Sequence, residues 1–359
     1  MFHSKQQKSA SLLGPILGAL LLCGAAQAGR AETGLGVVPA LQELERQGRL
    51  IQAKASAPLP SASAAIDWDQ IAPQRLRLLA QDSVAPGLEG GAAVDIQLRA
   101  LASETELALR IDWPDAQEDP YSQSHTDRFA DALAVQFVTD PDPDLPYIGM
   151  GQPQRPVALW YWQAGRGTQA LTAQGFGSLE PNPAMAAPEA LAEYRAGGWS
   201  LVLRGALPAT LNPLPLALAR WDGAGQGRDG RKQLSAWHLL VLPGRALAET
   251  RLQGLVEQGR SAGDASRGAR LAREQGCVAC HSLPGQAPSR IGPNLAQAGG
   301  LHWPGYLRQA IERPSAFIVP GAGHAIMDPQ GGARSLMPQL PLSPEQRDDL
   351  VAYLRQLVE

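Results

Sequence analysis

The chain has 359 residues, of which 44% are hydrophobic and 18% are charged, and its formal net charge at pH 7 is −3. Its length and hydrophobic content are sufficient for roughly two domains with proper cores. The slightly acidic balance excludes nucleic acid as an expected partner. Beyond the first 28 residues the sequence has two cysteines, Cys277 and Cys280, three positions apart, which excludes a scaffold held together by disulfides.

The first 28 residues have the pattern of a secretory signal peptide. Lys5 and Lys8 precede an apolar run from Leu12 to Leu22, and a stretch of small residues ends at Ala28. About 11 apolar residues are too few to span a bilayer core of roughly 30 Å. We therefore expect cleavage after Ala28, giving a soluble mature protein in the periplasm. The loss of Lys5 and Lys8 takes the formal charge to −5.

Residues 29–65 are rich in Ala, Pro and Ser, and one short helix is expected around Leu41, Leu44 and Leu50. This composition predicts an N-terminal arm that orders on a partner or stays mobile.

Residues 66–245 contain short alternations of apolar and polar residues, separated by Pro and Gly. Examples are Val94–Leu98, Leu107–Ile111, Leu133–Phe137, Val157–Tyr161 and Leu201–Leu203. Runs of period two at this spacing predict an antiparallel β-sandwich. Trp160 and Trp162 flank Tyr161, so the two tryptophans share one face of a strand, where core packing is expected.

After Gly244 the apolar period lengthens to that of helices. Helices are expected at 246–258, 265–275, 303–312 and 344–358. Ser343 is the expected N-cap of the last helix, with Pro344 at its first position and Glu345 in its first turn. We therefore expect a linker helix within 246–262 and a small all-α domain over 263–359.

The strongest chemical signal is Cys277-Val-Ala-Cys280-His281. Two thiols on one helical turn can each add to a haem vinyl group, while the next imidazole can ligate the iron, and this predicts one covalent c-type haem. A zinc half-site or a redox dithiol is the alternative. Zinc would need two more ligands at matching spacing, and the redox motif is typical of a βαβ unit.

Residues 263–359 resemble a class I cytochrome c along their whole length. The resemblance rests on the haem motif, on Ile291-Gly-Pro-Asn-Leu295 and on the closing segment Leu342–Leu354. In that family the sixth iron ligand is a methionine in a loop before the last helix, commonly followed by Pro. Met337, followed by Pro338, stands at that place, and Met327 is its competitor.

The sandwich segment resembles a second family, the haem b-binding γ subunits of ethylbenzene dehydrogenase, dimethylsulfide dehydrogenase and the selenate and chlorate reductases. The resemblance depends on the order of several matching stretches and covers about residues 66–243. These stretches are Gln97–Trp113, Phe129–Phe137, Pro146–Gly151, Val157–Trp162, Trp221–Gly223 and Gly230–Lys232.

In that family a methionine and a lysine ligate a non-covalent haem b, and the resemblance assigns these roles to Met150 and Lys232. A lysine ligates only as a neutral amine, so such a site must lower its pKa. The alternatives are a hydrophobic filler for Met150 and a solvated loop charge for Lys232.

Four histidines remain as candidates with ordinary explanations. His125 and His238 are the fallback ligands of the second haem, and His302 and His324 lie near the expected haem c site; each is more often a surface or packing residue.

Together the resemblances imply an electron-transfer subunit that binds haem b and haem c and has no catalytic residues of its own. Its implied partners are a molybdopterin α subunit, an iron–sulfur β subunit and a soluble periplasmic carrier. Tethering the cytochrome domain would raise its effective concentration at the second haem. Two alternatives remain open. One is a monohaem cytochrome fused to a carbohydrate-binding-like sandwich, and the other is a diheme peroxidase-like enzyme with an open iron position.

Overall fold

The computed structural model describes residues 37–142, 144–260, 262–289, 291–321, 324–327 and 329–358. The predicted signal peptide and the beginning of the predicted arm lie outside the described residues. Within these ranges, no helix has the length and apolar character needed to cross a membrane.

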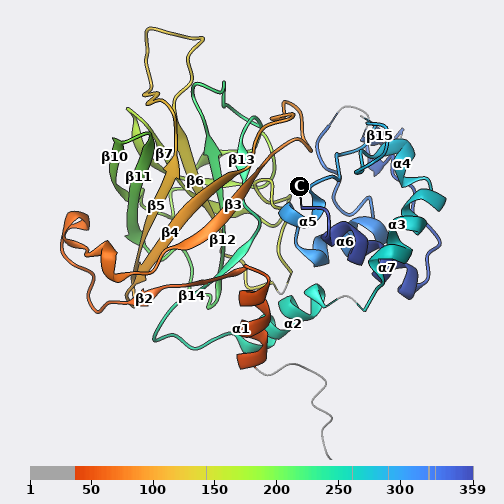
Figure 1. Ribbon diagram of the computed structural model, residues 1–359, viewed down its shortest axis with the longest axis horizontal. Coiled ribbons are helices and arrows are strands. Elements are labelled where there is room, and N and C mark those ends of the chain that lie inside the picture. Colours follow the sequence, from red (N-terminus) through yellow and green to blue (C-terminus); the bar gives the residue numbers. More distant parts are fainter. Residues whose placement is uncertain are drawn as a thin grey trace, which may run out of the picture. The chain divides into compact units, whose positions relative to one another are not determined.

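The predicted β-sandwich is confirmed, and its strands form one continuous sheet that folds over on itself (Figure 1). The strand order is β10-β11-β5-β4-β3-β13-β12-β6-β7-β8-β9, and these neighbours are antiparallel. The strands are β3 (Gln74–Ala80), β4 (Val94–Ala102), β5 (Glu106–Pro114), β6 (Ala132–Val138), β7 (Val157–Gln163), β8 (Gly167–Ala173), β9 (Glu180–Pro181), β10 (Glu189–Arg195), β11 (Gly198–Ala206), β12 (Leu214–Trp221) and β13 (Gln233–Leu234).

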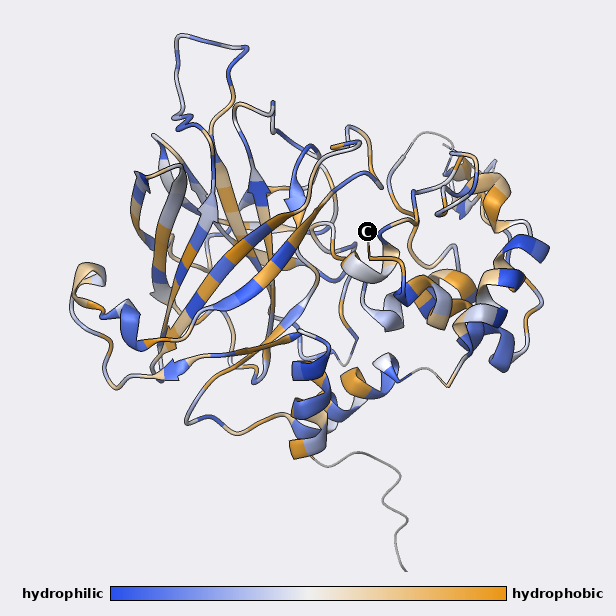
Figure 2. Ribbon diagram, viewed as in Figure 1, coloured by the Kyte–Doolittle hydropathy of each residue, from blue (hydrophilic) through white to orange (hydrophobic). Residues whose placement is uncertain are grey.

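Alternation along the strands separates an inner face from an outer one, and Figure 2 shows this alternation of hydropathy on the central strands. On β6 the inner residues are Leu133, Val135 and Phe137, which belong to a buried cluster shared by both halves of the sheet. Trp160 and Trp162 on β7 join the same cluster, as predicted. The outer face of β6 carries Ala132, Ala134, Gln136 and Val138.

Part of the predicted N-terminal arm belongs to the sandwich and its covering helices. Helix α1 (Val37–Arg46) buries Ala40 and Leu44. Strand β1 (Leu50–Gln52) pairs in parallel with β14 (His238–Val241), which also pairs with β12, and β2 (Lys54–Ala55) pairs in parallel with β4. Short 3-10 turns follow at Ser63–Ala65 and Trp68–Gln70. The described part of the arm is therefore ordered by this chain's own sheet and needs no partner to fold.

The C-terminal third is helical, as predicted, with one added hairpin. Its helices are α2 (Glu249–Gly259), α3 (Ala265–Glu274), α4 (Cys277–Cys280), α5 (Ala298–Leu301), α6 (Pro304–Glu312) and α7 (Pro344–Arg355), and the hairpin is β15 (Ala325–Met327) with β16 (Ala333–Ser335). The predicted N-cap is confirmed, because the Oγ of Ser343 accepts a hydrogen bond from the backbone N–H of Gln346 at 3.2 Å.

A second buried cluster covers the outer face of the half-sheet that contains β12, β6 and β7. It contains side chains from that face together with residues of α1, α2 and α5, and with Trp303, which caps α6. A third cluster lies inside the helical third and packs α3 against α6 and α7.

Candidate functional site

The Cys-X-X-Cys-His motif forms a single helical turn at the wall of a cavity of about 250 Å³, which we call the helical cavity. Gly276 precedes the turn with φ 73°, a left-handed conformation that suits glycine. Cys277 and Cys280 both line the cavity. Burial raises the pKa of the Cys277 thiol. Two cysteines therefore face one largely apolar space.

His281 is oriented into the helical cavity by a hydrogen bond to the backbone. Its Nδ1 donates to the carbonyl oxygen of Pro293 at 2.8 Å, which leaves Nε2 as the nitrogen with a free lone pair. Gly292 lies so close that a Cβ there would stand 2.8 Å from the imidazole Cε1. Burial lowers the pKa of His281, so the neutral form needed for metal ligation is favoured.

The two candidate methionines have different surroundings. Met337 lines the helical cavity together with both cysteines and His281. Met327 lies in β15, is 64% exposed and is not part of the cavity wall. The cavity therefore brings the predicted covalent, proximal and sixth-ligand residues together and leaves Met327 outside.

His302 and His324 also line the helical cavity. The Nδ1 of His324 donates to the carbonyl oxygen of Val319 at 2.8 Å. His302 is buried between aromatic rings, and burial lowers its pKa to about 4. His302 is thus a packing residue, whereas His324 has a ring nitrogen near the haem motif.

A larger cavity of about 930 Å³ lies on the outer face of the half-sheet, and we call it the sheet cavity. Its volume is at the upper end of the range for small-molecule and cofactor sites. Ala132, Ala134 and Ala219 contribute short side chains to its wall. Met150 and Lys232 line the same cavity, and Met150 has φ 68°. A positive φ is uncommon for residues other than glycine. Residues with such strained backbones cluster at active sites and ligand-binding segments.

Lys232 is 2% exposed and is among the largest fully buried side chains of the described residues. Its Nζ lies 5.0 Å from the ring centres of both Phe176 and Trp221, and no carboxylate forms an ion pair with it in the described part of the chain. Burial lowers the pKa of Lys232 to about 8, with a smaller opposing effect of Asp229. Lys232 is therefore not a solvated loop charge, and its neutral amine is accessible at moderate pH.

The fallback histidines of this cavity differ in position. His125 is exposed and lies at its rim. His238 lies in β14, lines neither cavity and donates from Nδ1 to the carbonyl oxygen of Ala236 at 2.9 Å. Burial together with the positive charge of Arg49 lowers the pKa of His238 to about 3. His238 is a satisfied core histidine.

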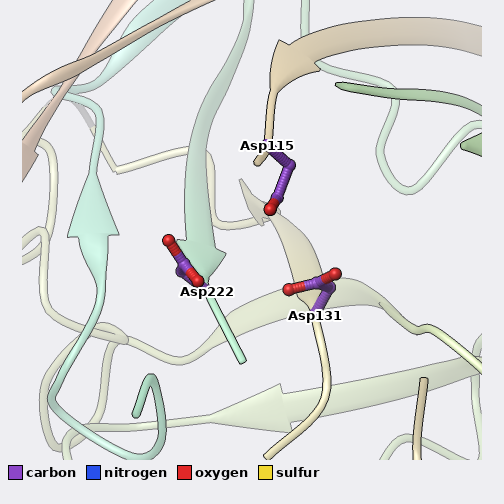
Figure 3. Close-up of side chains that lie close together, drawn as sticks. All are labelled: Asp115, Asp131 and Asp222. Atoms are coloured by element: carbon purple, nitrogen blue, oxygen red, sulfur yellow. The ribbon is translucent and has the colours of Figure 1, made fainter. Parts of the chain in front are cut away.

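Three aspartates gather beside the end of the sandwich, a cluster that the sequence did not reveal (Figure 3). Arg220 donates to Asp115 at 2.6 Å and to Asp222 at 3.3 Å. Asp131 accepts hydrogen bonds from Trp199 Nε1 and from the backbone N–H of Gly223. The carboxylates are thus paired within the protein, and we interpret the cluster as structural.

A Cys-X-X-Cys-His turn in the wall of a largely apolar cavity is typical of a domain that binds haem c. Residues 65–186 match the family model described as ethylbenzene dehydrogenase, and residues 265–358 match that of cytochrome c.

Among known proteins, the chlorate reductase subunit gamma of Ideonella dechloratans is 30% identical over 233 residues, which cover 61% of this chain and 93% of that protein. The dimethylsulfide dehydrogenase subunit gamma of Rhodovulum sulfidophilum is 28% identical over 159 residues, covering 39% of this chain and 57% of that protein. The chain therefore belongs to the family of the chlorate reductase γ subunit, with a cytochrome c domain at its C-terminal end.

Among solved structures, a carbohydrate-binding module of family 9 from Caldicellulosiruptor kristjanssonii, in complex with glucose, covers 55% of this chain and 96% of its own. The TM-score is 0.33 at 9% identity, which is too low for any inference about ligands.

Proposed function

We propose that this chain is a diheme electron-transfer subunit, with a non-covalent haem b in the sheet cavity and a covalent haem c in the helical cavity. The observation that carries the proposal is the side chain of Lys232. A buried lysine without a carboxylate partner is costly, and this one shares its cavity with Met150.

In the helical cavity, Cys277 and Cys280 would hold the haem through thioether bonds. His281 would ligate the iron through Nε2, since its Nδ1 is engaged by Pro293. Met337 would supply a second protein ligand to the iron. Haem c supplies a one-electron redox couple, and a thioether ligand raises its potential.

In the sheet cavity, Met150 and Lys232 would ligate the haem iron. The short alanine side chains on the outer face leave room for a flat macrocycle, while Phe176 and Trp221 exclude water around the amine. Desolvation keeps the amine of Lys232 ready to lose its proton.

The family suggests the partners. We expect a molybdopterin α subunit of the dimethyl sulfoxide reductase type and an iron–sulfur β subunit, with catalysis in the α subunit. A soluble periplasmic carrier would exchange electrons with haem c, and the predicted signal peptide supports a periplasmic location.

The decisive experiment is a pyridine haemochrome spectrum of protein made with c-type maturation machinery, before and after extraction with acid acetone. We expect one extractable haem b and one retained haem c per chain. Met150→Leu and Lys232→Met should each reduce haem b and leave haem c unchanged, and Met327→Leu, outside both cavities, serves as the matched control.

Two results would overturn the proposal in different ways. Haem c alone in folded protein supplied with haem, together with sugar binding in a calorimetric titration, would favour a carbohydrate-binding sandwich. A five-coordinate high-spin haem with peroxide turnover would favour a peroxidase-like enzyme.

A further inference from the structure

The walls of the two cavities share chain segments from both domains. Tyr147, from the sandwich, lines the helical cavity, while Ile148 and Met150, one and three residues later, line the sheet cavity. From the helical third of the chain, Val319 lines the helical cavity and Pro320, the next residue, lines the sheet cavity. Residues 147–150 and 319–320 therefore line both cavities, and Ser83 with Val84 forms a third segment that does so.

Aromatic rings fill this shared wall on the side of the helical cavity. The ring centre of Tyr147 lies 5.5 Å from that of His302, 5.2 Å from that of Tyr306 and 4.9 Å from that of Phe317. These distances are typical of directly packed aromatic pairs. Tyr147 is 2% exposed, so its neighbours cover almost all of its ring.

The sandwich and the helical third also share a hydrophobic core. Leu301 and Trp303 belong to the same buried cluster as Leu44, Leu79 and Val138. Domains move relative to one another by default, except where their interface is large and hydrophobic. The shared buried cluster shows that this interface is hydrophobic, which favours a fixed arrangement.

Polar contacts add to this core at two places. An Nη of Arg49 donates to the carbonyl oxygen of Gly299 at 3.0 Å, and the side-chain amide of Asn294 donates to the carboxylate of Asp82 at 2.6 Å. Asn294 follows Pro293, the partner of His281. The haem c motif is thus tied to the sandwich close to its own iron ligand.

From this geometry we infer that the cytochrome c domain is a fixed half of the molecule and that electrons cross directly between the two haems of one chain, through residues 147–150 and 319–320. The inference rests on the proposed function. In each transfer one ferrous iron is oxidised and the other, ferric iron is reduced, and no bond is made or broken. It goes beyond the expectation that tethering raises the effective concentration of the cytochrome domain at the second haem.

The kinetic test uses the full-length protein with both haems, whose content is first measured by haemochrome. In one experiment a flash-activated photoreductant adds one electron to the protein, and in a second experiment a photo-oxidant removes one. Using both makes net inter-haem transfer observable whichever haem has the higher potential. We expect a first-order inter-haem phase whose rate constant is the same across a wide range of protein concentrations and in added glycerol. A rate proportional to protein concentration, or one that falls as viscosity rises, would overturn the inference.

A larger side chain introduced at the interface between the sandwich and the helical third provides a second test. A Cβ at Gly300 would stand 2.4 Å from Cδ1 of Leu79, whereas a Cβ at Gly254 would have no atom within 4 Å. Gly300→Val should therefore slow the inter-haem phase and broaden the inter-haem distance distribution measured by pulsed EPR. Gly254→Val introduces the same side chain into a helix without touching the interface, and both properties should match those of the parent protein.

The outcomes separate the inference from the function on which it rests. If no haem b is found, the proposed function fails before any kinetics are recorded. If both haems are present but the parent protein shows a broad distance distribution, the function stands and the fixed arrangement is wrong. If Tyr147→Leu retains both haems and both potentials, a slower inter-haem phase supports a role for the aromatic wall, and an unchanged phase removes Tyr147 from it.

Discussion

Met327 and Met337 are ten residues apart, yet only Met337 faces the helical cavity. Met337→Leu should lower the reduction potential of haem c and abolish the absorption band of the iron–thioether bond, because a thioether ligand stabilises ferrous iron. Met327→Leu should change neither, since that side chain is 64% exposed. A redox titration of both variants checks this. The reverse pattern would assign the ligand to Met327, and no change in either variant would direct attention to His324.

His238 should make the stability of the protein sensitive to acid. Its pKa falls from 6.5 to about 3, chiefly because burial disfavours the charged ring. Between pH 6.5 and about 3, His238 binds a proton in the unfolded chain but not in the folded chain. The contribution of His238 to the free energy of unfolding is therefore fully present above pH 6.5 and is lost as the pH falls toward 3. The expected slope approaches about 1.4 kcal/mol per pH unit.

Urea unfolding of the parent protein and of His238→Gln, at several pH values between 7 and 4, tests whether stability falls with acid in this way. The free energy of unfolding should fall less steeply with acid in the variant. The difference between the two proteins removes the similar contribution of His302, whose pKa is also lowered. Parallel curves would show that the pKa of His238 is the same in the folded and the unfolded chain.

At the scale of elements, two helical glycines should respond oppositely to alanine. Gly254 lies inside α2 with open space around it, so Gly254→Ala should raise the free energy of unfolding by about 1 kcal/mol. Gly268 lies where α3 crosses α7, and a Cβ there would stand 2.0 Å from the backbone oxygen of Asp349. Gly268→Ala should therefore destabilise the protein, by roughly 1–3 kcal/mol.

Chemical unfolding followed by circular dichroism checks the pair. A stabilising effect at both positions would mean that α3 and α7 can move apart without loss, and a loss at both would mean that α2 requires a flexible residue at Gly254.

Elements with a strong period were predictable from the sequence, and those stabilised by distant partners were not. Strands β4 and β5 alternate apolar and polar residues over most of their length, and Ser343 with Pro344 marks the start of α7. Strand β1 has three residues, too few to show a period, and its partner β14 lies far along the chain. The candidate ligands of the two proposed haems could be named from the Cys-X-X-Cys-His motif and from resemblance, whereas the burial of Lys232 and the contacts of Tyr147 depend on tertiary packing that no local pattern reports.

For the whole molecule, the shared core predicts one unfolding transition. Leu301 and Trp303 lose their cover if either half unfolds, so the melting curve followed through tryptophan fluorescence should coincide with the curve followed through the absorbance of haem c. Coincident curves are the usual sign of two-state behaviour. Two separated transitions would show that the halves are independent domains. Gly300→Val should separate the curves more than Gly254→Val does.

The pairing of β1 with β14 also bears on the solubility of shortened forms of the protein. Strand β14 lies between β12 and β1, so a chain that begins after Gln52 would present an open row of backbone N–H and C=O groups along β14. Such an unpaired edge is a template for other chains. Strand β1 thus protects the edge of β14 from pairing with other chains. Proteolytic removal of β1 should favour oligomers in which two copies pair through their β14 strands.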